Sequence, residues 1–470
     1  MTEMSPASAL KHMANRAITV LSRRDLARPA ALLARLMTRT AISTAGANRV
    51  TSGRGKPVRV LLLPRSRFND DAFSMLRAVG PIEVVKLPRT VLKGIAAAFL
   101  PDDLGDNNYV SASPEAERAK LRYREFLVRF WRAFDPKRRI DAVITGNFGY
   151  YAEREFGGAL EILGVPFIAL HKENFWSKGS QEFWEGIYRE RRGPFLGRRI
   201  LVYSPIERDL QVRAGVVDEP RIEVVGMPRL DELHRWRSAN EGRIPRPLVL
   251  FASFHPDVSM PVLRRVALGP DGEERWTVLA DQRSAIHNLD ALCRSAHRAV
   301  LELATTCSDV CAVVKTKGRA RDRAVLLERM GVAHESELPR NLQVVHGGSP
   351  MPFLFEASLV CGLHSTLLIE GLAAGRPVLV PWYGEVLDPA ISRYIFDLGD
   401  AVIRASSPAE FLEQMKVLAR VRTPVPKALP AETVRILHEW LGNEDGRAGE
   451  RAATAIRRVI EATTRIAERY

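Results

Sequence analysis

The chain has 470 residues, of which 46% are hydrophobic and 26% are charged, and this composition excludes a disordered protein and favours two folded domains. Lysine and arginine number 69 against 55 aspartates and glutamates, and the formal charge of +14 favours anionic partners such as nucleotide phosphates, acidic lipids or polyanionic glycans. No apolar run reaches the roughly 18 residues of a membrane helix, and no signal-peptide pattern opens the chain, so we expect a cytoplasmic protein.

Residues 1–55 form a basic segment whose pattern is helical and differs from that of the rest of the chain. Leu32 and Leu36 lie on one side of the expected helix, with Arg28 and Arg35 interspersed. Two roles stay open for this segment. It either lies on an anionic membrane surface, which makes the protein peripheral to the inner face of the membrane, or it packs on its own domain.

From Pro57 onward, short apolar runs alternate with longer amphipathic ones, which predicts βαβ units and parallel sheets. The pattern restarts after the proline-rich stretch GRIPRP at residues 242–247. We therefore expect an α/β protein with two Rossmann-like, doubly wound lobes that face each other across a cleft, with a ligand at the carboxyl ends of the strands. The predicted lobes are residues 56–240 and 241–420, followed by C-terminal helices over 421–470. Strands are expected at 58–63, 82–87, 141–145, 166–170, 200–203 and 222–225, and in runs that begin near 248, 310, 342, 359 and 377.

The stretch GLHSTLLIEGLAAGRPVLVPW, residues 362–382, follows one of these strands and predicts a short helix. Ser365 and Thr366 cap its first backbone N–H groups, and His364 lies beside them. A helix start of this kind is suited to a phosphate. Glu370 is placed one turn further along the same face, where a carboxylate can accept both hydroxyl hydrogens of a ribose. The alternative is a capped helix whose glutamate faces water.

Two neighbouring strand ends carry groups that support a nucleotide site. Lys315 and Lys317 follow a buried strand in VVKTKGRARD, where ammonium groups can reach a diphosphate. Ser349 follows the next strand in VVHGGSP, after two glycines that let a ligand approach the backbone. Because these ends belong to one edge of one lobe, the sequence predicts a nucleotide-binding site there.

The order of elements and two motifs resemble the GT-B class of glycosyltransferases. HSTLLIEGLAAGRPVLV is similar to their donor-site signature, and GMPRLDEL, residues 226–233, is similar to the G-x-P-R-x-D stretch of CDP-glycerol glycerophosphotransferase-like and surface-polysaccharide enzymes. The resemblance implies phosphate contacts at Ser365 and Thr366, a ribose contact at Glu370, and Arg229 as a further donor-site residue. Where those enzymes usually have a lysine before a His-Pro pair and an Asp-Tyr-Ser-Ser turn, this chain has KTKG and GLHST, so the base and the transferred group stay open.

A transfer reaction also needs a base for the acceptor hydroxyl. His171 in FIALHKEN is expected just past the strand 166–170 of the N-terminal lobe, at the edge facing the cleft. Asp70 and Asp71 in RSRFNDDAF follow the first strand in the same way and are competing candidates. No D-x-D pair occurs in the chain, so we expect no metal, with basic side chains and a helix end neutralising the diphosphate instead.

The sequence thus predicts a metal-independent transferase that moves a sugar or polyol phosphate to a capsule or other cell-envelope polysaccharide. It needs no cofactor besides the nucleotide-activated donor, and its acceptor is a glycan or a lipid-linked glycan. No nucleic-acid-binding motif occurs. A nucleotide-sugar epimerase of the same two-lobed fold and a non-catalytic nucleotide-binding protein are the alternatives.

Overall fold

The computed structural model describes residues 6–41, 58–65, 68–102, 104–106, 109–111, 113–135, 139–172, 175–260, 262–268, 274–280, 289–316 and 322–467. The chain divides into two compact units. The first unit comprises Met1–Phe175, Glu185–Asp231 and Arg447–Tyr470, and the second comprises Trp176–Trp184 and Glu232–Gly446. The sequence pattern placed a boundary near residue 240 and treated the last helices as a separate region, whereas the structure assigns the end of the chain, from Arg447, to the first unit.

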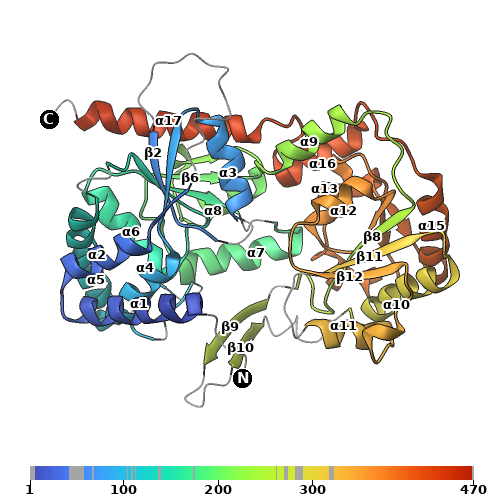
Figure 1. Ribbon diagram of the computed structural model, residues 1–470, viewed down its shortest axis with the longest axis horizontal. Helices are drawn as coiled ribbons and strands as arrows, with labels where there is room; N and C mark the ends of the chain where they lie inside the picture. The colour runs from blue at the N-terminus through green and yellow to red at the C-terminus, as the bar shows by residue number, and fades with distance from the viewer. Residues whose placement is uncertain are drawn as a thin grey trace. The chain divides into compact units, whose positions relative to one another are not determined.

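The first unit contains a seven-stranded sheet with the strand order β1-β3-β2-β4-β5-β6-β7. Strands β2 and β6 of this sheet are labelled in Figure 1. Five of its pairings are parallel, and β1 pairs antiparallel with β3 at one edge. The strand order reverses between β2 and β4, as it does in doubly wound sheets. The strands are β1 (Arg39–Ala41), β2 (Val58–Leu62), β3 (Ile82–Lys86), β4 (Ala142–Thr145), β5 (Phe167–His171), β6 (Arg199–Val202) and β7 (Ile222–Val224).

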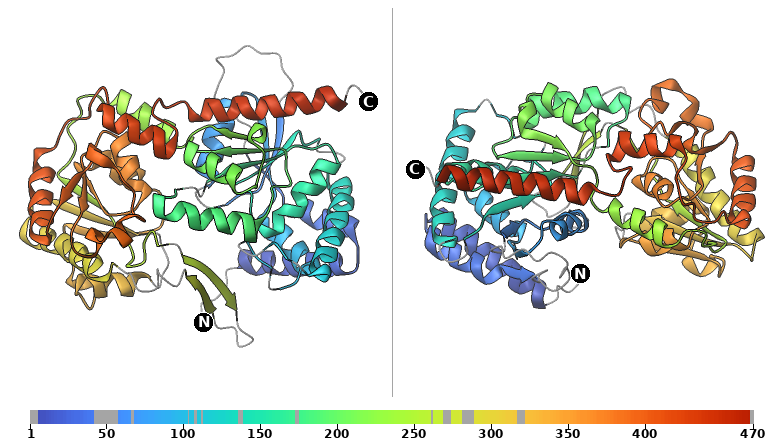
Figure 2. Two further views of the ribbon diagram at one scale, coloured as in Figure 1. Left: turned by 180° about the vertical axis from the view of Figure 1, so that it is seen from behind. Right: turned by 90° about the horizontal axis from the view of Figure 1, so that it is seen from above.

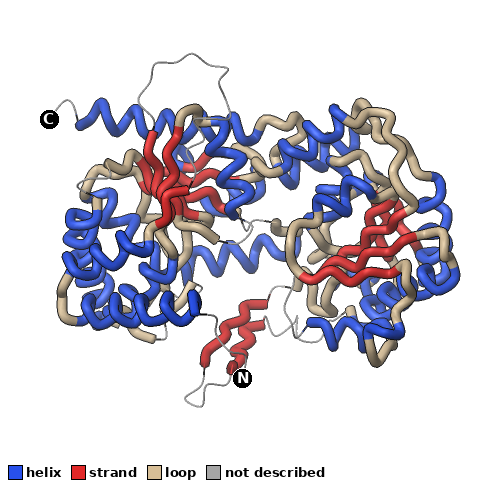
Figure 3. The backbone as a smooth tube through the Cα atoms, in the orientation of Figure 1, coloured by secondary structure: helices blue, strands red, loops and turns tan. Residues whose placement is uncertain are grey.

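Helices of the first unit lie on both sides of this sheet (Figure 3). Helix α1 packs on α4 and α2 packs on α5, so these two helices of the N-terminal segment pack on their own domain. Helix α17 packs on α3, and the view from above in Figure 2 shows it running along this unit. The helices are α1 (Pro6–Arg23), α2 (Ala27–Met37), α3 (Phe68–Ala78), α4 (Arg89–Phe99), α5 (Pro114–Phe134), α6 (Tyr151–Ile162), α7 (Lys178–Ile187, which crosses the unit boundary), the π-helix Tyr188–Arg192, α8 (Pro205–Arg213), the 3₁₀ turn Glu219–Arg221 and α17 (Ala448–Ala467).

Helix α5 illustrates why these segments fold as they do. Ser113 caps it by accepting from the N–H of Ala116 at 3.4 Å, and Pro114 occupies the first turn, where its missing N–H costs nothing. Tyr123, Phe126 and Phe130 recur at helical spacing and are fully buried. Burial of each such aromatic side chain contributes roughly 1.5 to 3 kcal/mol.

The second unit contains a six-stranded parallel sheet with the order β12-β11-β8-β13-β14-β15. This is the 3-2-1-4-5-6 order of the dinucleotide-binding sheet, and it reverses between β8 and β13. A separate antiparallel pair, β9 with β10, follows β8 in the chain. The strands are β8 (Leu248–Ala252), β9 (Val262–Leu268), β10 (Glu274–Ala280), β11 (Cys311–Thr316), β12 (Leu342–His346), β13 (Leu359–Cys361), β14 (Val378–Pro381) and β15 (Ile403–Ala405).

Helices again flank both sides of the sheet in this unit (Figure 1). They are α9 (Leu230–Ala239, which begins just before the unit boundary), α10 (Asp290–Thr306), α11 (Asp322–Met330), the 3₁₀ turn Glu335–Glu337, α12 (Met351–Glu356), α13 (Thr366–Ala373), the 3₁₀ turn Gly384–Leu387, α14 (Pro389–Ser392), the 3₁₀ turn Gly399–Ala401, α15 (Pro408–Val421) and α16 (Ala431–Leu441).

The predicted fold class, two Rossmann-like doubly wound α/β units, is confirmed by these two sheets. The antiparallel edge strand β1 and the β9–β10 pair were not predicted. The cleft between lobes stays a prediction. No helix in the described part of the chain is long and apolar enough to cross a membrane.

Candidate active site

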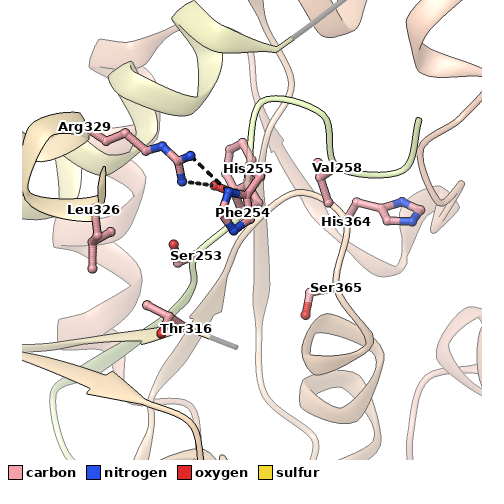
Figure 4. Close-up of a pocket in the computed structure, with 9 residues that line it drawn as sticks. All are labelled: Ser253, Phe254, His255, Val258, Thr316, Leu326, Arg329, His364 and Ser365. Atoms are coloured by element: carbon pink, nitrogen blue, oxygen red, sulfur yellow. Dashed lines mark hydrogen bonds between the residues drawn. The ribbon is translucent and has the colours of Figure 1, made fainter. Parts of the chain in front are cut away.

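A pocket opens in the second unit at the point where its strand order reverses. Strand β8 pairs with β11 on one side and with β13 on the other, so the segments that leave their carboxyl ends diverge there and leave room for a ligand. The pocket is lined by residues that follow β8 and β13, by the end of β11 and by helix α11 (Figure 4). These residues are Ser253, Phe254, His255, Val258, Thr316, Leu326, Arg329, His364 and Ser365.

One wall of the pocket is the start of helix α13. Ser365 is its N-cap residue, and its hydroxyl oxygen accepts a hydrogen bond from the N–H of Leu367 at 3.3 Å. Gly362, just before the turn, has φ of +152°, and a Cβ at this position would lie 3.0 Å from the carbonyl oxygen of Ala252. Glycine therefore lets the chain pass close to the end of β8. The result is a helix N-terminus with partial positive charge beside the pocket.

The cationic wall of the pocket is formed by Arg329 of α11. Its Nη1 donates to the carbonyl oxygen of Phe254 at 3.2 Å, and its Nη2 donates to Nδ1 of His255 at 3.0 Å (Figure 4). Because Nδ1 of His255 accepts this bond, the neutral imidazole carries its proton on Nε2 and presents a donor. A guanidinium and an imidazole N–H are both suited to an anionic ligand.

Ser253 lines the pocket, and two residues of helix α10 continue its hydrogen bonds away from the pocket. Its hydroxyl lies 2.9 Å from Nε2 of His297, and Nδ1 of His297 lies 2.6 Å from the carbonyl oxygen of Cys293. Burial lowers the pKa of His297 to about 4, and the charge of Arg329 adds to this effect. Burial also raises the pKa of the Cys293 thiol to about 11. Both side chains are therefore neutral at physiological pH.

Two of the predicted donor-site residues line the pocket, namely His364 and Ser365. The imidazole of His364 stacks on Phe396 with ring centroids 3.7 Å apart, and its Nδ1 accepts the N–H of Phe396 at 3.2 Å. Thr366 and Glu370 follow on α13 and do not line the pocket. Glu370 is buried, with 4% of its surface exposed.

The other predicted donor-site residues of this unit lie apart from the pocket lining. Lys315 is buried on β11, and its Nζ donates to the carbonyl oxygen of Thr316 at 2.8 Å. Ser349 is exposed beyond β12, and its hydroxyl oxygen accepts from the N–H of Met351 at 3.3 Å. Lys317 lies outside the described residues.

His171 in the first unit is the last residue of β5 and is completely buried. Its Nε2 lies 3.0 Å from Oε1 of Glu207 and 3.4 Å from the hydroxyl of Tyr188. Tyr188 and Gln211 also donate to Oε1 of Glu207, at 3.0 and 2.6 Å. His171 thus belongs to a buried polar network around one carboxylate, and it does not lie in the loop after the strand.

The two aspartates lie in the first turn of α3, where Asp70 is exposed and Asp71 is fully buried. Asp71 Oδ2 accepts from the hydroxyl of Tyr203 and from Nη1 of Arg229, both at 2.7 Å, and Oδ1 accepts the backbone N–H of Arg229 at 3.2 Å. Asp231, two residues further on, accepts the N–H groups of Ala448 and Gly449 at the start of α17, at 3.1 and 2.9 Å. Residues 226–231 of the GMPRLDEL motif, which belong to the first unit, therefore connect the end of β7 with α3 and α17.

Ser253, His255 and Arg329 line the pocket and escaped the sequence analysis, and so did His297, which lies behind Ser253. Ser253 and His255 follow the strand that begins at Leu248. The sequence analysis considered the polar residues after three other strands, and the same rule applied to this strand would have identified both. Arg329 had no such signal, because it reaches the pocket only through the packing of α11. Among the described residues, no group of three or more His, Cys, Asp or Glu side chains is arranged to hold a metal ion.

No protein-family model and no curated protein sequence matches the chain. Among solved structures, it is similar to the UDP-GlcNAc 2-epimerase from Methanocaldococcus jannaschii, with a TM-score of 0.46, 11% identity, and coverage of 86% of this chain and 100% of that one. It is also similar to the α,α-trehalose 6-phosphate synthase from Burkholderia multivorans, with a TM-score of 0.44, 12% identity, and coverage of 88% and 100%. A third similar structure is the glycosyltransferase of kitacinnamycin, with a TM-score of 0.44, 16% identity, and coverage of 86% and 100%. At these identities and TM-scores, the likeness carries no conclusion about activity or site residues.

Proposed function

We propose that the second unit binds the diphosphate of a nucleotide-activated donor in the pocket between the ends of β8 and β13. The protein then transfers a sugar or polyol phosphate from this donor to a cell-surface glycan. One observation supports the proposal: the capped N-terminus of α13, the guanidinium of Arg329 and the imidazole of His255 line the same pocket.

The physical reason is charge. A nucleoside diphosphate brings two to three negative charges, and its leaving group gains charge as the bond to the transferred group breaks. A helix N-terminus supplies about half a positive charge, and a guanidinium supplies a full charge with several N–H donors. Fixed donors of this kind stabilise a developing anion without a metal ion. We therefore propose a metal-independent reaction.

The remaining contacts with the donor are proposed from the positions of the residues on helix α13 and at the ends of the strands. Glu370 is one turn from Thr366 on α13, so a ribose diol bonded to its carboxylate has its phosphates toward Ser365. Lys315, Lys317, Ser349 and Arg229 are proposed as further donor contacts. In the structure Lys315 and Ser349 have hydrogen-bond partners close by in the chain, and Arg229 pairs with Asp71.

The group that deprotonates the acceptor is proposed to belong to the first unit. The imidazole of His171 lies beside the carboxylate of Glu207, and both side chains are fully buried. Asp70 is the exposed candidate. In a transfer assay, loss of turnover in His171→Asn with an active Asp70→Asn identifies the histidine as the base, and the reverse result identifies the aspartate.

We also propose that the faces of α1 and α2 that do not pack on α4 and α5 bind an anionic membrane, as suits a lipid-linked acceptor. Arg28, Leu32 and Leu36 follow one another at i, i+4 and i+8 on α2, and the two leucines are 58% and 75% exposed. On α1, Leu10 and Met13 are 70% and 66% exposed. Exposed apolar side chains next to cations are the pattern of helices that lie in a lipid interface.

A nucleotide-sugar epimerase of the same fold also binds a nucleotide, so the deciding experiment follows the products. The full-length protein is incubated with UDP-, CDP-, GDP- and ADP-activated sugars and CDP-glycerol in the presence of EDTA, with and without a glycan acceptor. Transfer predicts acceptor-dependent nucleotide release. An epimerised donor without such release favours the epimerase, and binding of nucleotide without either product favours the non-catalytic alternative.

A further inference from the structure

The hydroxyl of Ser253 is held from behind by a chain of hydrogen bonds. It lies 2.9 Å from Nε2 of His297, whose Nδ1 lies 2.6 Å from the carbonyl oxygen of Cys293, four residues earlier on α10. His297 is fully buried, and its ring packs against Phe251 and Phe254 with centroids 5.0 and 5.6 Å away. Ser253 itself is half-buried and lines the pocket.

The carbonyl of Cys293 fixes which atoms carry hydrogen in this chain. A carbonyl oxygen only accepts, so Nδ1 of His297 must carry the proton, and Nε2 of a neutral ring is then an acceptor. The contact between Nε2 and Ser253 is therefore a bond in which the serine hydroxyl donates. Its only hydrogen is directed to His297, and the oxygen presents lone pairs to the pocket.

We infer that Ser253 acts as an obligate hydrogen-bond acceptor in the pocket and binds an uncharged donor group of the ligand, namely a sugar hydroxyl or a base N–H, and not a phosphate oxygen. This inference rests on the proposed function. It assigns donor groups of the pocket to the phosphates and the acceptor Ser253 to an uncharged part of the ligand. Phosphate oxygens need donors, which Arg329, His255 and the start of α13 supply. Ser253 repels a phosphate oxygen because lone pairs would face each other, so it selects the orientation of the nucleotide.

A serine bonded to a histidine is also the arrangement of nucleophilic catalysis, in which the imidazole takes the serine proton. Here that step would create an imidazolium that is fully buried behind Ser253. Its Nδ1–H is bonded to a carbonyl and not to a carboxylate, and Arg329 and His255 further disfavour a positive charge on the ring. The geometry therefore favours the acceptor role for Ser253.

The hydrogen positions are tested directly by nitrogen NMR on the full-length protein labelled with ¹⁵N-histidine, with His297→Gln used to assign the signals. The expected result at pH 7 is a neutral His297 ring with its proton on Nδ1. A proton on Nε2, or a charged ring, overturns the inference whether or not any nucleotide binds.

Binding is tested with inorganic pyrophosphate and with the tightest of UDP, CDP, GDP and ADP as probes. Ser253→Ala should weaken the nucleoside diphosphate about 3- to 10-fold, the effect of one lost hydrogen bond, and leave pyrophosphate within about twofold. Ser295→Ala is the matched control, because this half-buried serine of the same unit does not line the pocket. Equal weakening of both probes, or of neither, overturns the inference. If no nucleotide binds, the proposed function fails and the NMR result alone decides the role of Ser253.

Discussion

Replacement of Arg329 by glutamine removes the one guanidinium among the described residues that line the pocket. The substitution Arg329→Gln keeps a polar side chain but deletes the charge and the fork of N–H donors. In the structure this fork spans the carbonyl oxygen of Phe254 and Nδ1 of His255, so it also holds the segment after β8 in place. The variant therefore affects both the charge of the pocket and the position of His255.

The expected loss of nucleotide affinity follows from the charged hydrogen bond that Arg329 would donate to a phosphate oxygen. A hydrogen bond to a charged group contributes about 1.5 to 3 kcal/mol when it is shielded from water. Arg329 is half-buried, so its contact with a diphosphate falls in this range and not at the larger values of a dry interior. We expect the affinity for a nucleoside diphosphate to fall about 10- to 150-fold.

The assay is isothermal titration of the full-length protein with UDP, CDP, GDP and ADP. Arg323→Gln is a matched control, because Arg323 lies on the same helix, pairs with Glu335 and does not line the pocket. The control should bind nucleotide as the wild type does. A folded Arg329→Gln protein with unchanged nucleotide affinity would refute the assignment of the anion site to this pocket.

Three further predictions address other parts of the molecule. Glu370→Gln should weaken nucleotide binding by about 1.5 to 3 kcal/mol in the same titration, through lost bonds to the ribose, and unchanged affinity would remove Glu370 from the site. Because burial lowers the pKa of His297 to about 4, whereas an unfolded histidine titrates near 6.5, the unfolded chain binds the extra proton. The free energy of unfolding should therefore fall as the pH drops from about 6.5 towards 4, by up to about 3 kcal/mol. Urea unfolding at several pH values measures this dependence, and His297→Gln should lose it. A pH dependence equal to that of the wild type in the variant would contradict the assignment. The double variant Leu32→Glu/Leu36→Glu should bind vesicles of acidic lipid at least about 30-fold more weakly, because about 1 to 2 kcal/mol is lost at each leucine. Leu387→Glu, at a leucine that is 59% exposed in the second unit, should bind as the wild type does, and equal binding by all three proteins would exclude the helices as the lipid surface.

The sequence was sufficient for features that depend on local pattern. The strands β4, β5 and β8 consist of apolar runs, which end in Thr145 and His171 in the first two, and every residue in them is buried. The start of α13 follows from the cap at Ser365, which the structure confirms by its bond to Leu367. These elements are specified by neighbouring residues alone.

Features that depend on packing between distant segments could not be predicted. The β9–β10 pair mixes charged and apolar residues and belongs to neither main sheet, so it lacks the apolar run that marks the other strands. Helix α17 joins the first unit through its packing on α3 and through the capping of its N-terminus by Asp231, some 217 residues earlier in the chain. Likewise, the pairing of Arg229 with Asp71 joins residues 158 positions apart, and the motif around Arg229 gave no sign of this partner.

The central claim is that the pocket of the second unit holds a nucleotide diphosphate. A crystal structure of the full-length protein with the tightest-binding nucleoside diphosphate tests it most directly. The account predicts phosphate oxygens within hydrogen-bond distance of Arg329 and of the first N–H groups of α13, with the ribose toward Glu370. A nucleotide bound at another place in the chain, with this pocket unchanged, would contradict it.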